Sequence, residues 1–280
     1  MGTSDSTAAL ASAGLRVERQ PLATGCIEIW WLDQPASRNA LTDALVEALL
    51  AACGRAAADR DLRGVVLRGS GGHFCAGGSL GGFAQAIGQP LAPGEDDPLV
   101  PMNRRFGTLL QALCALPQWL LVAVEGAAMG GGIGLVCCAD HVLADADAQF
   151  ATPEVTLGVV PAQIAPFVVR RLGAARARRW LLTGARQDAA AALQDGLVDE
   201  VAPAGGLDAA LAGAIARHCA AAPQAVAATK QLLRVEAETP LPQLLDAAAH
   251  AFAAGLRGPE ARQGLAAFAA RQPAPWSVKP

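Results

Sequence analysis

Tyrosine is absent from this 280-residue sequence, which also contains only four histidines and two lysines, Lys230 and Lys279. The absence of tyrosine excludes a tyrosine acid at any catalytic site. Neither lysine follows a glycine-rich loop, so P-loop and Schiff-base chemistry both have poor candidates. An excess of positive charge is missing as well, since the formal net charge is −3. We therefore expect no nucleic-acid partner.

Cysteines with metal-binding spacing are also absent. The seven cysteines form no CxxC pair and several lie in apolar stretches, so we interpret them as reduced packing residues of a cytoplasmic protein and expect no metal site. The most apolar stretch, residues 119–139, is interrupted by Glu125 and by glycines, and no signal-peptide pattern opens the chain. We expect no membrane span.

What is present is a composition that can form a full-sized core, with 52% hydrophobic and 17% charged residues. The pattern predicts strands at 26–32, 64–67, 120–124, 141–144 and 149–151. Between them it predicts a helix that Thr42 or Asp43 caps and residues 59–61 end, and another at about 102–115. From Pro161 onward we find only helical patterns, at about 163–171, 174–183, 188–195, 207–221, 223–236, 241–254 and 259–270. We therefore predict a flexible tail at 1–13, an α/β core at 14–205 and a helical region at 206–280.

Two glycine loops and one glutamate follow predicted strands of the core. The loops are FCAGGSL at 74–80 and GGG at 130–132, which opens a helix; the glutamate is Glu154, directly after Pro153. Glycine loops at two strand ends can direct two backbone N–H groups at one point, which is the geometry of an oxyanion hole. A carboxylate close to that point could move protons at the carbon next to a polarised carbonyl.

These residues also carry a family resemblance. The segments RNAL at 38–41, FCAGGSL at 74–80, EGA with MGGG within 125–132, and TPE at 152–154 resemble, in order and spacing, the crotonase (enoyl-CoA hydratase/isomerase) superfamily. The resemblance implies an α/β fold, a crotonase-like spiral of ββα units, with 206–280 as an α-helical trimerisation region. It also implies acyl-CoA substrates, no cofactor beyond the CoA of the substrate, and a homotrimer or a dimer of trimers.

By position in these motifs, the resemblance assigns roles to individual residues. The oxyanion donors fall on the N–H groups of Gly78 and Gly131, and the acid/base group on Glu154. The residues implied in CoA binding are Arg38, Ala40, Ala76, Gly77, Leu80 and Gly130, with Phe268 and Arg271 reaching the CoA of a neighbouring subunit.

Two departures from the family pattern bear on the reaction. The best-known hydratases hold water with two glutamates, but Gly134 occupies the first of these positions here, and Ser79 replaces an aspartate in the glycine loop. One glutamate suffices for an isomerase that shuttles a proton between C2 and C4; hydration with Glu154 alone is harder but possible. The segment 158–171 resembles hydratases of branched glutaconyl-CoA, especially isohexenylglutaconyl-CoA, and favours hydration. On this interpretation the missing side chain at Gly134 gives the branch room.

Two other functions stay open. Residues 77–81, GGSLG, fit the G-x-S-x-G nucleophile motif, so Ser79 with His218 or His250 could form a serine-type thioester hydrolase. Loss of one glutamate also fits a non-catalytic acyl-CoA-binding protein, although Glu154 and both glycine loops argue against it.

Overall fold

Two β-sheets form the frame of the protein. The computed structural model describes residues 9–78, 87–91, 94–235 and 239–277. Within these residues a six-stranded sheet has the order β1-β2-β3-β4-β6-β9, and a smaller one the order β5-β7-β8. The larger sheet contains β1 (Leu15–Pro21), β2 (Cys26–Leu32), β3 (Leu62–Gly69), β4 (Trp119–Val124), β6 (His141–Asp145) and β9 (Glu200–Ala202). The smaller one contains β5 (Ala127–Met129), β7 (Gln149–Ala151) and β8 (Gln187–Asp188).

The chain alternates between the two sheets as it advances. Strand β4 leads directly into β5, and β6 leads directly into β7, so each turn adds one strand to each sheet before a helix follows. Strands β2, β3, β4, β6 and β9 pair in parallel, whereas β1 pairs antiparallel with β2. This repeated strand-strand-helix turn is the predicted ββα spiral, and it brings the ends of β3, β5 and β7 to one region.

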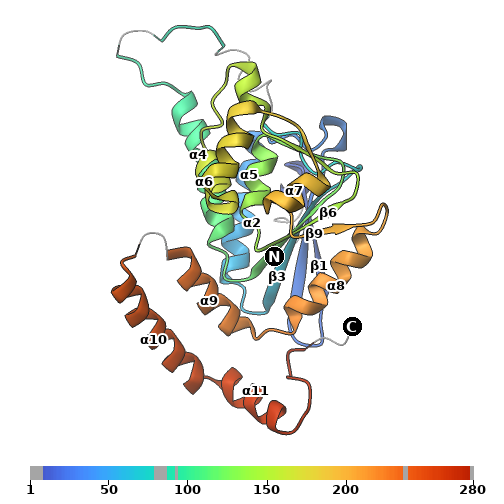
Figure 1. Ribbon diagram of the computed structural model, residues 1–280, viewed down its shortest axis with the longest axis vertical. Helices are drawn as coiled ribbons and strands as arrows, with labels where there is room; N and C mark the ends of the chain where they lie inside the picture. Colours follow the sequence, from blue (N-terminus) through green and yellow to red (C-terminus); the bar gives the residue numbers. More distant parts are fainter. Residues whose placement is uncertain (1–8, 79–86, 92–93, 236–238, 278–280) are drawn as a thin grey trace.

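Helices cover both faces of the large sheet. In Figure 1, α2 (Asp43–Ala58), α4 (Leu99–Cys114), α5 (Gly131–Cys137) and α6 (Ala165–Thr183) lie on one side, and α8 (Leu207–Cys219) lies beside the strands at the other. Strand β4 shows why both faces are buried: Leu120, Val122 and Val124 join the core under the first group of helices. Its alternate residues join a second core with Leu207 and Leu211 of α8.

The last three helices bury little of their surface: α9 packs against the second core through Val226, whereas α10 and α11 stand apart from the sheets. Helices α9 (Pro223–Val235), α10 (Leu241–Arg257) and α11 (Pro259–Ala269) contain no fully buried residue, and Figure 1 shows α10 and α11 extended away from the body. Phe252 and Phe268 are 72% and 83% exposed. Such an apolar surface is typical of a region that another protein covers. The boundaries at 13/14 and 205/206 stay predictions.

The expectation of helices alone after Pro161 is wrong. Strand β8 precedes the short helix α7 (Ala189–Asp195), and β9 adds to the edge of the large sheet beside β6. Strands of two or three residues carry too few positions to show alternation, and they form because a neighbouring strand offers backbone partners. The predicted helices at 163–171 and 174–183 are one element, α6, interrupted at Gly173, where φ is 73°. Among the helices of the described residues, none is both long and apolar enough to cross a bilayer.

Candidate active site

The first glycine loop lies between the two sheets, directly after β3. Cys75 exchanges two backbone hydrogen bonds of 2.9 Å with β5, which fixes the loop beside that strand. Gly77 has a φ of +90°, and a β-carbon there would stand 2.8 Å from the carbonyl oxygen of Met129, so the close approach requires glycine. The next N–H, that of Gly78, donates to no acceptor among the described residues.

The second glycine loop joins β5 to α5. Gly130 has a φ of +49° and donates its N–H to the carbonyl of Ala151 over 2.8 Å. Gly131 is the first residue of α5, where an N–H has no acceptor within the helix. A β-carbon on Gly77 would stand only 3.5 Å from the nitrogen of Gly131, so the two loops are in contact. The Gly131 N–H therefore lies close to the residue that precedes Gly78, an arrangement that suits an oxyanion hole.

Glu154 lies beside these donors in the short helix η2 (Pro153–Leu157). The preceding Thr152 is buried and its hydroxyl donates to the carbonyl of Trp180 over 3.0 Å, which anchors the segment to α6. A β-carbon on Gly130 would stand 2.8 Å from Oε1 of Glu154, so the carboxyl lies directly against the second glycine loop.

The environment of this carboxyl suits proton transfer. Its Oε2 atom is buried and has no hydrogen-bond partner among the described residues. Burial raises the pKa of Glu154 above its ordinary value, against the opposing effect of its own backbone N–H. A carboxyl with a raised pKa and an unused oxygen can accept a proton from a ligand and return it.

Apolar side chains form the wall on the other side of Gly131. A β-carbon on Gly131 would stand 2.8 Å from Cδ1 of Leu41 and 3.4 Å from Cζ of Phe106. Farther along α5, the space at Gly134 is already filled: a β-carbon there would stand 2.6 Å from Cγ2 of Ile164 and 3.3 Å from Cδ1 of Leu110. The expectation that Gly134 leaves room for a branched substrate is therefore wrong, because Ile164 occupies that room.

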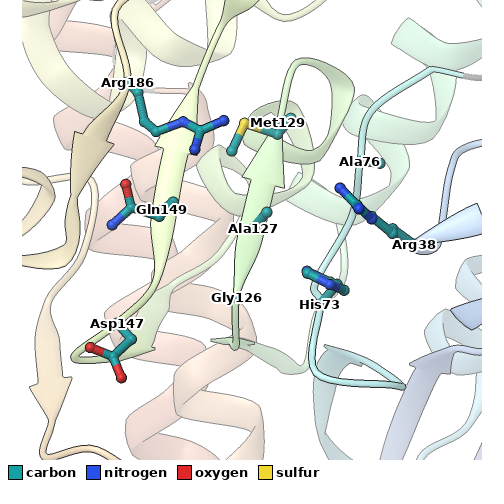
Figure 2. Close-up of a pocket in the computed structure, with 9 residues that line it drawn as sticks. All are labelled: Arg38, His73, Ala76, Gly126, Ala127, Met129, Asp147, Gln149 and Arg186. Carbon is teal, nitrogen blue, oxygen red and sulfur yellow. The ribbon is translucent and has the colours of Figure 1, made fainter.

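A charged cavity of about 280 Å³ adjoins the first glycine loop (Figure 2). Arg38 and Arg186 project from opposite sides of it, with the outer surface of β5 between them. His73 also lines it, and the Nδ1 atom of that ring is buried without a hydrogen-bond partner among the described residues. The cavity combines two guanidinium groups and an imidazole with the carboxylate of Asp147, and the two guanidinium groups suit a ligand carrying phosphates.

Comparison with known proteins identifies the family. A family model described as enoyl-CoA hydratase/isomerase matches residues 24–279. The chain belongs to the enoyl-CoA hydratase/isomerase family.

Solved structures and a curated relative agree with this assignment. An enoyl-CoA hydratase/isomerase from Marinobacter aquaeolei superposes with a TM-score of 0.87 at 40% identity, covering 94% of this chain and 98% of its own. AtuE from Pseudomonas aeruginosa gives a TM-score of 0.86 at 42% identity, covering 93% and 99%. The 2,3-dehydroadipyl-CoA hydratase of Escherichia coli is 33% identical over 241 residues, which are 85% of this chain and 89% of that one. The predicted crotonase-like fold is confirmed.

The structure brings most of the predicted site residues of this enoyl-CoA hydratase/isomerase family member together. Gly130, Gly131 and Glu154 meet at the contact between the two glycine loops, and Gly78 follows Gly77 in the first of these loops. Gly77 lies in the same contact, Arg38 and Ala76 line the adjoining cavity, and Ala40 directly precedes Leu41, which bridges to Gly78.

Three of the predicted CoA-binding residues are not part of this arrangement. Leu80 and the neighbouring Ser79 lie outside the described residues. Phe268 is on α11 and Arg271 directly follows it, apart from the site within one chain. Their prediction concerns a neighbouring subunit and stays a prediction.

Two residues have roles that the motifs did not indicate. Asn39 is fully buried, and its side chain joins three backbone groups: it accepts from the N–H of Gln34 over 2.9 Å and donates to the carbonyls of Ser70 and His73 over 2.9 and 2.7 Å. Asn39 thus holds the approach to the first glycine loop. Arg186 reaches the cavity from the segment before β8, and no sequence motif contains it.

Proposed function

We propose that this family member adds water across the 2,3 double bond of an acyl-CoA thioester. The observation that carries the proposal is the contact of Glu154 with the glycine loop that presents the Gly131 N–H; one carboxyl oxygen of Glu154 is buried and has no hydrogen-bond partner within the described part of the chain. This contact supports acid/base chemistry and carbonyl polarisation at one point.

The chemistry follows from this geometry. The thioester oxygen accepts hydrogen bonds from the N–H groups of Gly78 and Gly131, which draws electron density from C3 and stabilises the enolate as its charge develops. A donor of this kind contributes roughly 10² to 10³ in rate. Glu154 takes a proton from the water that attacks C3 and returns a proton to C2, a contribution of about 10² to 10⁴. The fixed backbone dipoles need no reorganisation during the reaction.

The CoA portion of the substrate would extend over the first glycine loop. Arg38 and Arg186, with His73, would bind its phosphates in the charged cavity, and no further cofactor takes part. Phe268 and Arg271 would complete the binding site of an adjacent subunit in a homotrimer or dimer of trimers, which the exposed apolar side chains of α10 and α11 support. We also propose that the protein is cytoplasmic.

The acyl group that we propose is a glutaconyl group with a branch at C3, such as isohexenylglutaconyl. The 158–171 segment supports this choice by its resemblance to hydratases of such substrates, and Ile164 within it lies against α5. The relative named 2,3-dehydroadipyl-CoA hydratase supports a substrate with a distal carboxylate. Because Ile164 fills the space at Gly134, the branch must lie elsewhere, beside Leu41 and Phe106.

Isomerisation is the second candidate, since the single carboxylate Glu154 is sufficient to move a proton from C4 to C2.

Hydrolysis has less support. Cys75 is buried, and burial raises the pKa of its thiol to about 12, so it is not a nucleophile. His218, a candidate partner for Ser79, belongs to α8; its Nε2 lies 3.1 Å from Nδ1 of His141, and its ring centroid lies 5.4 Å from that of Trp119.

A substrate panel tests the proposal. Purified protein is assayed with crotonyl-CoA, a 3-enoyl-CoA and a 3-substituted glutaconyl-CoA, and products are separated by mass and NMR. We expect water addition, fastest with the branched glutaconyl-CoA, and unchanged rates in Ser79→Ala. Double-bond migration alone would favour the isomerase, free CoA release lost in Ser79→Ala would favour the hydrolase, and binding without any turnover would favour a non-catalytic role.

A further inference from the structure

After α11 the chain turns back toward the body of the protein (Figure 1). The indole ring of Trp276 packs on α11, since a β-carbon on Gly264 would stand 2.9 Å from Cη2 of that ring. The Nε1–H of the same ring donates to the carbonyl of Ala220, between α8 and α9, over 3.1 Å. Trp276 thus joins the last helix to the end of α8.

A buried arginine of the large sheet anchors this contact. Arg63 of β3 is 5% exposed, and its guanidinium donates to the carbonyls of Cys219 and Ala221 over 2.8 and 2.9 Å. It also donates to the carbonyl of Trp276 over 2.5 Å. A cation is stabilised at the carboxyl end of a helix, and the planar guanidinium presents several donors at once. Arg63 therefore ties the end of α8 and the Trp276 segment to β3.

A second contact holds the beginning of α11. Glu260 lies in the first turn of that helix and accepts hydrogen bonds from the N–H of Gln224, over 2.9 and 3.1 Å, and from that of Ala225, over 3.2 Å. Both N–H groups belong to the first turn of α9, where they have no acceptor within the helix and favour a carboxylate. Glu260, Trp276 and Arg63 together form the α11 clasp.

The turn that ends α11 carries an arginine where glycine is favoured. The N–H of Arg271 donates to the carbonyl of Phe268 over 3.0 Å, and that of Gln272 donates to the carbonyl of Ala267 over 2.9 Å. This pair of hydrogen bonds is the Schellman pattern, in which the residue after the helix takes a left-handed conformation. Arg271 has a φ of 55°, which glycine adopts without strain and arginine does not.

The other non-glycine residues with such a φ lie at the active site. Within the described part of the chain they are Arg38 and Asn39, and the carbonyl of Arg38 accepts from the N–H of Ala76 in the first glycine loop over 2.9 Å. Backbone strain of this kind is concentrated at functional sites. Arg271 is exposed and the turn itself would favour glycine, so the guanidinium points to a binding role.

We propose that the α11 clasp positions Arg271 in the CoA-binding site of a neighbouring subunit, with Glu260 and Trp276 as positioning residues. The inference rests on the proposed function, in which Phe268 and Arg271 bind the CoA of an adjacent subunit. The phosphates of CoA are the groups that the guanidinium would bind. Because the clasp acts through α11, it affects binding of the nucleotide portion of CoA and leaves proton transfer at Glu154 unchanged.

Binding of butyryl-CoA to the full chain, measured by calorimetry, tests the clasp apart from turnover, because this thioester has no double bond to hydrate. Butyryl-pantetheine, which lacks the nucleotide and its phosphates, is the matched ligand and is measured by displacement. We expect Trp276→Ala to weaken butyryl-CoA binding roughly five- to tenfold, with butyryl-pantetheine binding unchanged and kcat for crotonyl-CoA within about twofold. Trp276→Phe keeps a ring against α11 and should retain part of the affinity.

A matched pair of glycine substitutions tests the packing of the ring. Gly264→Ala presses on the indole of Trp276 and should weaken butyryl-CoA binding in the same direction as Trp276→Ala. Gly255→Ala on α10 is the control, since no atom lies within 4 Å of its β-carbon position, and it should leave binding unchanged.

Arg271→Gly tests the residue that the clasp presents. Glycine suits the left-handed φ, so the Tm should be no lower than that of the unmutated protein, while butyryl-CoA binding weakens. If Trp276 acts through Arg271, adding Trp276→Ala to Arg271→Gly should weaken binding by much less than Trp276→Ala does alone.

The proposal is overturned if Trp276→Ala binds butyryl-CoA as tightly as the unmutated protein, or if the losses of Trp276→Ala and Arg271→Gly add fully. Equal weakening of butyryl-CoA and butyryl-pantetheine binding, or a lower molar mass of Trp276→Ala by light scattering, also overturns it, because Trp276 would then act on folding or assembly. A monomeric unmutated protein overturns it too. Failure of the proposed hydration gives a different result: crotonyl-CoA is not hydrated, whereas the effects on butyryl-CoA binding persist.

Discussion

A methyl group at Gly134 should destabilise the protein, because the space above its α-carbon is already occupied. The new β-carbon would stand 2.6 Å from Cγ2 of Ile164 and 3.3 Å from Cδ1 of Leu110, both of which are buried. Overpacking of this kind costs about 1–3 kcal/mol. Replacing glycine by alanine in a helix returns roughly 0.5–1 kcal/mol. We expect Gly134→Ala to lower the free energy of unfolding by about 1 kcal/mol, the difference between the middle values of these two ranges.

Urea unfolding at a fixed protein concentration measures this difference. Gly54→Ala on α2 is the matched control, because no atom lies within 4 Å of its β-carbon position, and it should gain up to about 1 kcal/mol. Combining Ile164→Val with Gly134→Ala should restore part of the lost free energy of unfolding. Combining Ile164→Val with Gly54→Ala should give no such gain. If Gly134→Ala unfolds at the same urea concentration as the unmutated protein, or a higher one, the site is open and the reasoning about Ile164 fails.

Two further results are expected at the catalytic centre. Burial raises the pKa of Glu154 in the folded protein, so the folded state binds the carboxyl proton more tightly than the unfolded state does. The free energy of unfolding therefore falls as the pH rises above 4.5, the ordinary pKa of the group. Glu154→Gln should therefore have a higher Tm than the unmutated protein at neutral pH and lose this advantage below about pH 4.5; an advantage that persists in acid would contradict burial as the cause. Gly130→Ala places a β-carbon 2.8 Å from Oε1 of Glu154 at a φ of +49°. Its kcat should fall at least tenfold as the carboxyl is displaced, and full activity would show that Glu154 does not act from this position.

Local sequence signals predicted the elements that they determine directly. Helix α2 begins where expected, because the Thr42 hydroxyl accepts a hydrogen bond from the N–H of Leu45 over 3.2 Å. Strand β2 has the predicted bounds, and both glycine loops lie at strand ends. In each case the residues concerned are neighbours in the sequence.

Features that depend on distant residues could not be predicted in this way. Strand β9 forms because β6 offers an edge, and its three residues have no pattern of their own. Ile164 fills the space at Gly134 from thirty residues away, which a sequence pattern does not show. Arg186 reaches the charged cavity because β8 pairs with β7. The motifs indicated the chemistry of the site and two residues of its outer lining, Arg38 and Ala76, whereas Arg186 was evident only from tertiary structure.

The role of Glu154 as the acid/base group is tested most directly by turnover and binding measured together in Glu154→Gln. The substitution keeps the shape of the side chain and removes its ability to take a proton, while the N–H groups of Gly78 and Gly131 remain. With a saturating enoyl-CoA substrate we expect kcat to fall by about 10² to 10⁴ and acyl-CoA affinity by calorimetry to stay within a few-fold. Hydration at an unchanged rate in Glu154→Gln would contradict the proposed mechanism.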